Sequence, residues 1–317
     1  MGRTRRQILR RHDETLSGRL RARIARSTVL DTRKPYYLYE APGLANATAA
    51  PLLLLLRGHE REWVNMKEDD SRRRSTAIED VDRLVAEGAL PPLLAVMPGL
   101  NSSDNHVPSL GIDMVGTWPG YRYSLGTGRF WTYLTEELLP NVAAGYPAVT
   151  GPRVAVGFSL GGYTASLLAL HQPEALDHVA IYDGLFMWPR HNDPRENGAA
   201  FSDPVWCEAS IFDAALGRPR DRDALRRWNP TDRLQNGPST LLRPLRDTTF
   251  WIGCAAGDGN RGNRDRARFF TKLLRRQDVP VGLDRVVFDD EARHTWHWAD
   301  RFLQYVLAQA LPEPTTV

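Results

Sequence analysis

The sequence has little cysteine and no long apolar segment. Only 2 of its 317 residues are cysteines, too few for a disulfide framework, and their spacing matches no metal-binding motif. The longest apolar run spans residues 51–56, far short of the about 20 residues needed to cross a bilayer. No apolar stretch of the kind found in secretory signals follows the basic N-terminus. These absences argue against a disulfide-rich or membrane-spanning protein and make a cytoplasmic location the default expectation.

The composition is that of a folded protein. Hydrophobic residues make up 42% and charged residues 25% of the chain, which excludes a disordered, collagen-like or coiled-coil protein. Basic residues are concentrated near the N-terminus, where residues 1–17 form a basic arm. The arm contains no nucleic-acid-binding motif, so we expect no nucleic-acid partner. The length allows a single α/β domain over residues 1–317.

Strand and helix patterns alternate along most of the chain. Short apolar runs bounded by turns predict strands, and apolar residues that recur every three or four positions predict helices. The expected strands cover residues 19–26, 35–40, 51–57, 93–97, 154–158, 179–182, 248–256 and 283–288. The expected helices cover residues 74–88, 130–139, 161–171, 264–277 and 296–310. This order predicts an α/β fold with about eight strands in a mostly parallel sheet, an antiparallel start and helices on both faces. An insertion at 184–247 is expected to shape the substrate pocket.

The string Gly157-Phe158-Ser159-Leu160-Gly161 is the most informative motif. It lies between a short apolar strand, RVAVGF, and a helical pattern, GGYTASLLALHQ, which is the setting of a nucleophile elbow. Glycine is required where the turn is so tight that a side chain would strike the neighbouring backbone. Ser159 is therefore the candidate nucleophile. The alternative interpretation is an ordinary strand-to-helix turn with a capping serine.

A serine nucleophile needs a base, and the base needs a carboxylate to orient it. Asp258 and His294 each follow an expected strand, at the edge where α/β sheets build their sites. The order Ser159, Asp258, His294 is the chain order of the α/β-hydrolase triad. Asp183 also ends an expected strand and is an alternative carboxylate, and His297 is an alternative base. Because His294 and His297 lack a third ligand at a recognisable spacing, we expect no metal.

Acyl transfer from an ester also needs an oxyanion hole. The backbone N–H of Leu160, which follows the nucleophile, is expected to be one donor, and the N–H of His59 the other. Gly58 precedes His59 and is expected to let the backbone approach the substrate closely. The candidate lining residues of the substrate pocket are Gly58, Trp63, Asp183 and Trp296.

With these residues in place, the chain resembles the esterase D, or putative-esterase, family of α/β-hydrolases. That family includes S-formylglutathione hydrolases, feruloyl esterases, enterochelin esterases and the antigen 85 mycolyltransferases. The likeness rests on GFSLGGYTASLLALHQPEALDHVAIYDG, on GTGRFWTYLTEELLP, and on GDGNRGNRDRARFFTKLL with RHTWHW, within about residues 18–310. The resemblance implies an acyl-enzyme mechanism with Ser159, Asp258 and His294 in the triad positions and no cofactor.

The chain departs from the family at two places. Arg57-Gly58 stands where the family usually has His-Gly, and Asp183-Gly184 stands where it usually has Ser-Gly. The leading hypothesis is nevertheless hydrolysis of a small-molecule carboxylic ester. The alternative is an acyltransferase that passes the acyl group to an alcohol, sugar or amine. Thioester or peptide cleavage and a catalytically silent binding role are further hypotheses.

Overall fold

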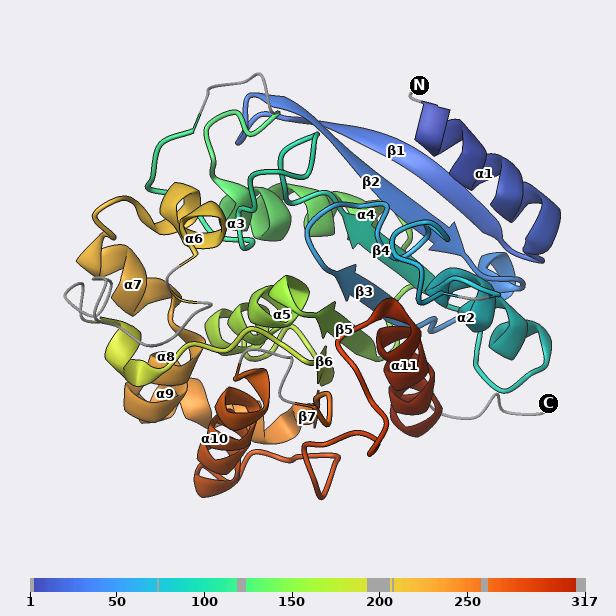
Figure 1. Ribbon diagram of the computed structural model, residues 1–317. Helices are drawn as coiled ribbons and strands as arrows, with labels where there is room; N and C mark the ends of the chain where they lie inside the picture. Colours follow the sequence, from blue (N-terminus) through green and yellow to red (C-terminus); the bar gives the residue numbers. More distant parts are fainter. Residues whose placement is uncertain are drawn as a thin grey trace.

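The computed structural model describes residues 3–72, 74–118, 124–192, 206, 208–257 and 262–311. Within them, seven strands form one sheet in the order β1-β2-β4-β3-β5-β6-β7 (Figure 1). The strands are β1 (Arg19–Ser27), β2 (Thr32–Glu40), β3 (Leu52–Leu56), β4 (Leu94–Pro98), β5 (Arg153–Phe158), β6 (His178–Tyr182) and β7 (Thr249–Gly253). β2 pairs antiparallel with both β1 and β4, and all other neighbours are parallel. The expected mostly parallel sheet with an antiparallel start is confirmed.

The eighth expected strand, at residues 283–288, does not form a regular ladder. Two isolated bridges join this part of the chain to β7, Phe250 with Val281 and Cys254 with Val287. The bridging residues are four positions apart on the β7 side and six apart on the other side. Two extra residues therefore separate the contact points, and an unbroken ladder would need equal spacing on both strands.

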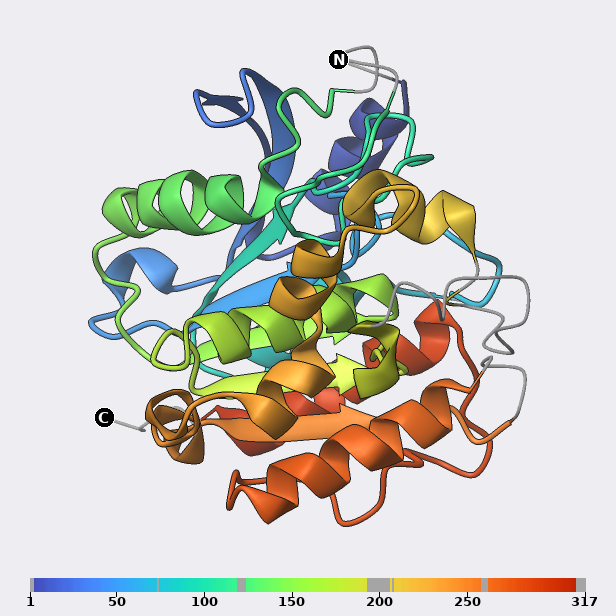
Figure 2. The same cartoon turned by 90° about the vertical axis from the view of Figure 1, so that its left-hand side faces the viewer.

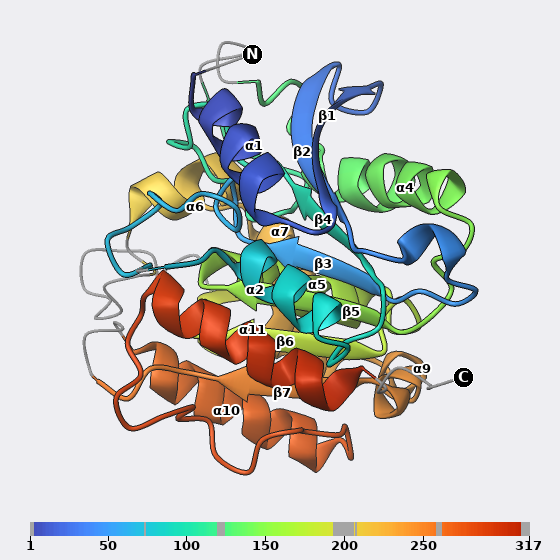
Figure 3. The same ribbon diagram turned by 90° about the vertical axis from the view of Figure 1, so that its right-hand side faces the viewer.

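Helices cover both faces of the sheet. In Figure 3, α1, α2 and α11 lie on the face toward the viewer, whereas Figure 2 shows α4, α5 and α10 on the opposite face. No helix in the described ranges has the length and apolarity that a membrane crossing requires. The helices are α1 (Arg3–Thr15), α2 (Ala77–Ala86), α3 (Phe130–Thr132), α4 (Leu139–Gly145), α5 (Leu160–His171), α6 (Ala209–Leu216), α7 (Arg222–Trp228), α8 (Pro230–Asn236), α9 (Ser239–Leu242), α10 (Asn263–Arg276) and α11 (Trp296–Ala310), with a π-helical segment, η3 (Tyr133–Leu138), between α3 and α4 and shorter turns at η1 (Leu44–Asn46), η4 (Pro189–Asn192) and η6 (Pro244–Asp247).

The apolar strand β3 separates two hydrophobic cores. Leu53 and Leu55 belong to the core that α2 and α11 cover, and Leu54 and Leu56 belong to the core that α5 covers. Successive side chains of a strand point to opposite faces, so a strand buried on both faces must be apolar throughout. The continuous leucine run thus follows from the central position of β3.

Two segments have more helix than the sequence patterns indicate. Most of the basic arm at 1–17 forms α1, whose buried residues are Ile8 and His12. With so few apolar positions, the arm carries no helical periodicity to detect. The insertion at 184–247 contains α6, α7, α8 and α9 among its described residues. Its role in shaping a substrate pocket remains a prediction.

Candidate active site

Ser159 occupies a sharp turn between β5 and α5. Its backbone adopts φ 54° and ψ −115°, a conformation with positive φ that is unfavourable for a residue with a side chain. A Cβ atom at Gly157 would lie 2.3 Å from the Gly161 carbonyl oxygen, and one at Gly161 would lie 1.9 Å from the Leu56 carbonyl oxygen. Gly157 therefore lets the turn close on itself, and Gly161 lets it pack against β3. Ser159 itself is half-buried.

Asp183, at the carboxyl end of β6, contacts His294. Its Oδ2 atom forms a short hydrogen bond with Nδ1 of His294, while its Oδ1 atom accepts the N–H of Ala255 at 3.3 Å. The aspartate is 0% exposed, and its own N–H donates to the Gly253 carbonyl at 2.7 Å. The carboxylate is thus held by β7 on one side and reaches the histidine on the other.

The His294 ring lies next to the nucleophile turn. It packs on the ring of Phe158, the residue before Ser159, with the ring centroids 4.8 Å apart. Asp258, the other expected carboxylate, lies outside the described residues. Of the two carboxylates considered from the sequence, Asp183 is the one that the described structure pairs with His294. The sequence signal for it was an aspartate directly after a buried strand.

The two expected oxyanion donors differ in their surroundings. Among the described residues, nothing accepts the N–H of Leu160, at the start of α5. The N–H of His59 donates to Oε2 of Glu62 at 2.6 Å, so the donor expected from the sequence is already occupied by a carboxylate. Burial raises the pKa of Glu62, an effect that the nearby Arg57 charge and the His59 N–H oppose.

The residues expected to line a substrate pocket have other neighbours. A Cβ atom at Gly58 would lie 2.3 Å from the Asn101 side chain, so this glycine makes room for the chain after β4. Trp63 and Trp296 are 1% and 4% exposed and pack edge to face, with ring centroids 5.0 Å apart. Both indoles belong to the core beneath the site. Asp183 is buried as the partner of His294.

A buried arginine, Arg72, joins the loop after β3 to the helix after His294. Its guanidinium makes two hydrogen bonds to the Asp300 carboxylate, at 2.7 and 2.9 Å. It also donates to the carbonyls of Glu62 and Asn65, at 2.5 and 3.0 Å, and lies 4.1 Å from the Trp296 ring centroid. An isolated arginine carries no recognisable pattern, so the role of Arg72 could not be identified from the sequence.

The same loop also caps the first turn of α11. The Asp69 carboxylate accepts a hydrogen bond from the N–H of Trp296 at 3.3 Å, and the Ser71 hydroxyl accepts one from the N–H of His297 at 3.1 Å. His297 therefore belongs to the helix start, one turn away from His294, and its pairing with Asp183 is not observed. The loop that carries the expected oxyanion donor and the helix that follows the expected base are thus fixed to one another.

Metal and thiol chemistry find little support in the described residues. No group of three or more metal-ligating side chains occurs among them. Cys254 is buried directly after β7, and burial together with the Asp183 charge raises the pKa of its thiol to about 12. A thiol with such a pKa is not an effective nucleophile at neutral pH.

Comparison with known proteins gives a consistent result. The Putative esterase family model matches residues 47–310. The chain is similar to a solved ferulic acid esterase, with a TM-score of 0.66 and 19% identity over 93% of this chain and 98% of that one. It is also similar to an S-formylglutathione hydrolase from Agrobacterium tumefaciens (TM-score 0.63, 19% identity, 94% and 97% covered) and to a fluorophosphonate-binding serine hydrolase from Staphylococcus aureus (TM-score 0.58, 15% identity, 92% and 98% covered). No curated protein sequence matches the chain. At such identities the structural likeness establishes a shared α/β-hydrolase fold.

Proposed function

The chain belongs to the putative-esterase family and is a hydrolase that acts on esters, and on that premise we propose an acyl-enzyme mechanism on Ser159. His294 acts as the general base and Asp183 orients it. The substrate is a small-molecule carboxylic ester, and the reaction needs no cofactor. The observation that carries the proposal is the hydrogen bond between His294 and a fully buried aspartate, directly beside a strained serine turn.

The pairing of Asp183 with His294 determines which ring nitrogen is free. An ionised carboxylate only accepts hydrogen bonds, so Nδ1 of His294 carries a proton and Nε2 keeps its lone pair. Nε2 is then the atom that takes the Ser159 proton as Oγ bonds to the ester carbonyl carbon. The same proton passes to the departing alcohol. Water then attacks the acyl-enzyme, again through Nε2, and the acid leaves as Ser159 regains its proton.

The buried position of Asp183 supports its role over that of a surface carboxylate. The imidazolium formed during attack needs a nearby negative charge, and that charge is most effective where water does not screen it. Two backbone hydrogen bonds hold the carboxylate in place without side-chain reorganisation: the Ala255 N–H donates to the Asp183 side chain, and the Asp183 N–H donates to the Gly253 carbonyl at the end of β7. Asp258 remains the competing assignment from the family pattern.

We assign the oxyanion hole to the N–H groups of Leu160 and His59. The second donor requires that Glu62 release the His59 N–H when substrate binds. The Arg57 guanidinium supports such a movement, because its Nε lies 3.8 Å from Oε1 of Glu62 and has no hydrogen-bond partner in the described chain. A carboxylate that leaves the His59 N–H thus has a cation beside it. No described feature favours acyl transfer over hydrolysis.

Intact-protein mass spectrometry after treatment with a fluorophosphonate tests the nucleophile. We expect one adduct on the wild-type protein, located at Ser159 by peptide mapping, and none on Ser159→Ala. A panel of p-nitrophenyl esters of increasing chain length then measures turnover and the size of the acyl pocket. An adduct at another residue, or turnover that survives in Ser159→Ala, would exclude the proposed mechanism.

A further inference from the structure

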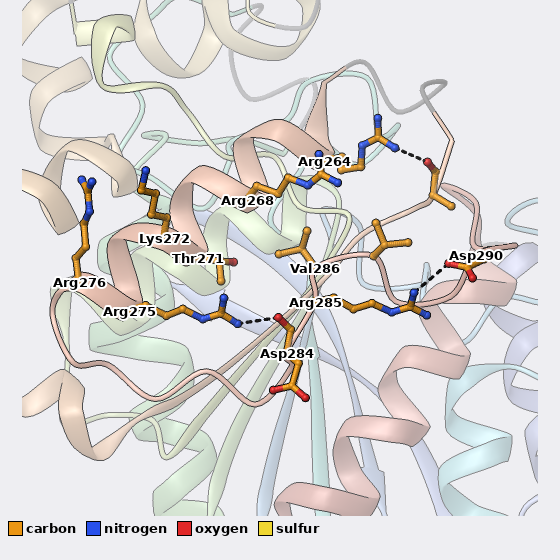
Figure 4. Close-up of a pocket in the computed structure, with 12 residues that line it drawn as sticks. Arg264, Arg268, Thr271, Lys272, Arg275, Arg276, Asp284, Arg285, Val286 and Asp290 are labelled. Carbon is orange, nitrogen blue, oxygen red and sulfur yellow. Dashed lines mark hydrogen bonds and ion pairs between the residues drawn. The ribbon is translucent and has the colours of Figure 1, made fainter.

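A wide basic groove lies along α10, away from the residues proposed for catalysis. It is a cavity of about 780 Å³ between α10 and the chain segment that follows this helix, and Figure 4 shows the side chains that line it. Neither Ser159, Asp183 nor His294 lines it. The lining residues used below are Arg264, Arg268, Thr271, Lys272, Arg275, Arg276, Asp284, Arg285 and Asp290.

The cations on α10 form a row. Arg264, Arg268, Lys272 and Arg276 are spaced by four residues, which places them along one side of the helix at intervals of about 6 Å. Arg275 lies on the same helix. Arg285 belongs to the other wall, where its side chain extends toward Asp290 (Figure 4). Only two of the lining residues are acidic. The groove therefore presents positive charge over a length of about 18 Å, as estimated from the helical rise.

Much of this charge is not neutralised by a carboxylate. Arg264 donates to the Ala256 carbonyl at 2.8 Å. Arg275 donates to the Leu283 and Asp284 carbonyls, which hold its side chain without cancelling its charge. Arg268 lies 3.8 Å from the Asp265 carboxylate. Arg285 does pair with a carboxylate, that of Asp290, at 3.1 Å.

The remaining two cations of the row, Lys272 and Arg276, are exposed. Neither makes an ion pair within the described residues. Two positive charges at one end of the groove are thus available to an anionic ligand, in addition to that of Arg275, which backbone carbonyls hold in position.

A buried hydroxyl group adds a second, independent observation. Thr271 lies between Arg268 and Arg275 on the wall formed by α10 and is only 3% exposed. Its Oγ1 atom has no hydrogen-bond partner among the described residues. Figure 4 shows this oxygen on the side of the residue that faces Val286 and the groove. Buried hydroxyl groups are normally paired, because an unpaired one is costly. The unpaired Thr271 hydroxyl and the row of cations both favour a polar, negatively charged ligand.

We propose that this groove binds a small ligand that carries an oligophosphate, such as a nucleoside triphosphate or inorganic tripolyphosphate. Several cations in a row match several linked phosphates better than a single anion. Arginine is suited to this task because its planar guanidinium donates two parallel hydrogen bonds to phosphate oxygens. The cavity volume lies in the range of small-molecule sites, about 300–1,000 Å³, which favours a nucleotide-sized ligand over a long polymer.

Isothermal titration calorimetry on the full-length protein tests the proposal with two probes, tripolyphosphate and ATP. The test variant is Arg268→Gln/Lys272→Gln. The matched control is Arg222→Gln/Arg226→Gln, which removes two exposed arginines with the same spacing from α7. We expect each probe to bind the wild type and the control equally well. Each probe should bind the test variant at least about tenfold more weakly, because two charged hydrogen-bond donors are removed.

Comparison of the two probes distinguishes a nucleotide ligand from a phosphate chain alone. Tighter binding of ATP than of tripolyphosphate supports a nucleotide ligand, and equal binding supports recognition of the phosphate chain alone. No binding of either probe at 1 mM, or equal weakening by the control variant, overturns the proposal. A groove that binds only single-stranded oligonucleotides or anionic vesicles overturns it as well. Ester turnover should be unchanged in the test variant, so this outcome does not depend on the proposed catalytic function.

Discussion

Replacing Arg72 with methionine is expected to destabilise the protein and to loosen the loop after β3. Methionine keeps much of the length of the side chain but removes all four hydrogen bonds of the guanidinium. The Asp300 carboxylate then loses its charged partner, and the carbonyls of Glu62 and Asn65 lose a donor. Because the Arg72 side chain is fully buried, water cannot replace these bonds without opening the structure.

The size of the effect follows from burial. Removing one partner of a buried ion pair typically costs about 3–5 kcal/mol. Burial already raises the pKa of Asp300 to about 6 in spite of Arg72, so the unpaired carboxyl is expected to take up a proton at neutral pH. Protonation avoids an unpaired buried charge. We therefore expect the free energy of unfolding to fall by about 3 kcal/mol, near the lower end of that range.

Urea denaturation followed by tryptophan fluorescence measures the loss, with Arg72→Met/Asp300→Leu as the control. Because the double variant leaves no unpaired carboxyl, it should recover at least about half of the lost free energy of unfolding. A single variant within about 1 kcal/mol of the wild type would show that Arg72 is not an anchor. Equal losses in the single and double variants would show that the unpaired Asp300 is not the cause.

Three further outcomes are expected. The free energy of unfolding in urea should be about 1 kcal/mol higher for Ser159→Gly than for Ser159→Ala, because only glycine relieves the strain of the positive φ. Both variants should lose turnover. The reverse order of stability would show that the backbone at Ser159 is not strained. Burial raises the pKa of Asp300 from 3.8 to about 6, so its contribution to the free energy of unfolding is full below 3.8 and declines as the pH rises through 6. Urea melts of Asp300→Asn should therefore depend less on pH in this interval than those of the wild type. Glu62→Ala should react faster with a fluorophosphonate, because the His59 N–H becomes free; slower labelling of equally stable protein would remove His59 from the oxyanion hole.

The parts of the fold and site that follow from local chemistry were predictable from the sequence. The glycines around Ser159 are required by backbone atoms within a few residues and by the adjacent strand, so the strand-turn-helix motif identifies the turn. The leucine run of β3 likewise reports a strand that is buried on both faces. The regular elements of the sheet were therefore found close to their observed positions, apart from the interrupted eighth strand.

The contacts that connect distant parts of the chain were not predictable in this way. Asp183 and His294 are 111 positions apart, and Arg72 and Asp300 are 228 apart, so no local pattern relates them. The sequence offered two carboxylates at strand ends, and only the spatial order of β6 and β7 brings Asp183 to the histidine. The hydrogen bond that the His59 N–H donates to Glu62 was equally unpredictable, because it depends on a turn with no regular pattern.

The most direct test of the proposed catalytic relay is the kcat of Asp183→Asn and Asp258→Asn on an ester that the wild type hydrolyses. The asparagine at 183 keeps the shape but not the charge, and we expect a loss of about 10⁴-fold, as in other serine triads. Thermal melts should confirm that both variants are folded. Asp258→Asn should retain kcat within about tenfold of the wild type, by the same triad logic. A larger loss in Asp258→Asn than in Asp183→Asn would contradict the assignment of Asp183 as the residue that orients His294.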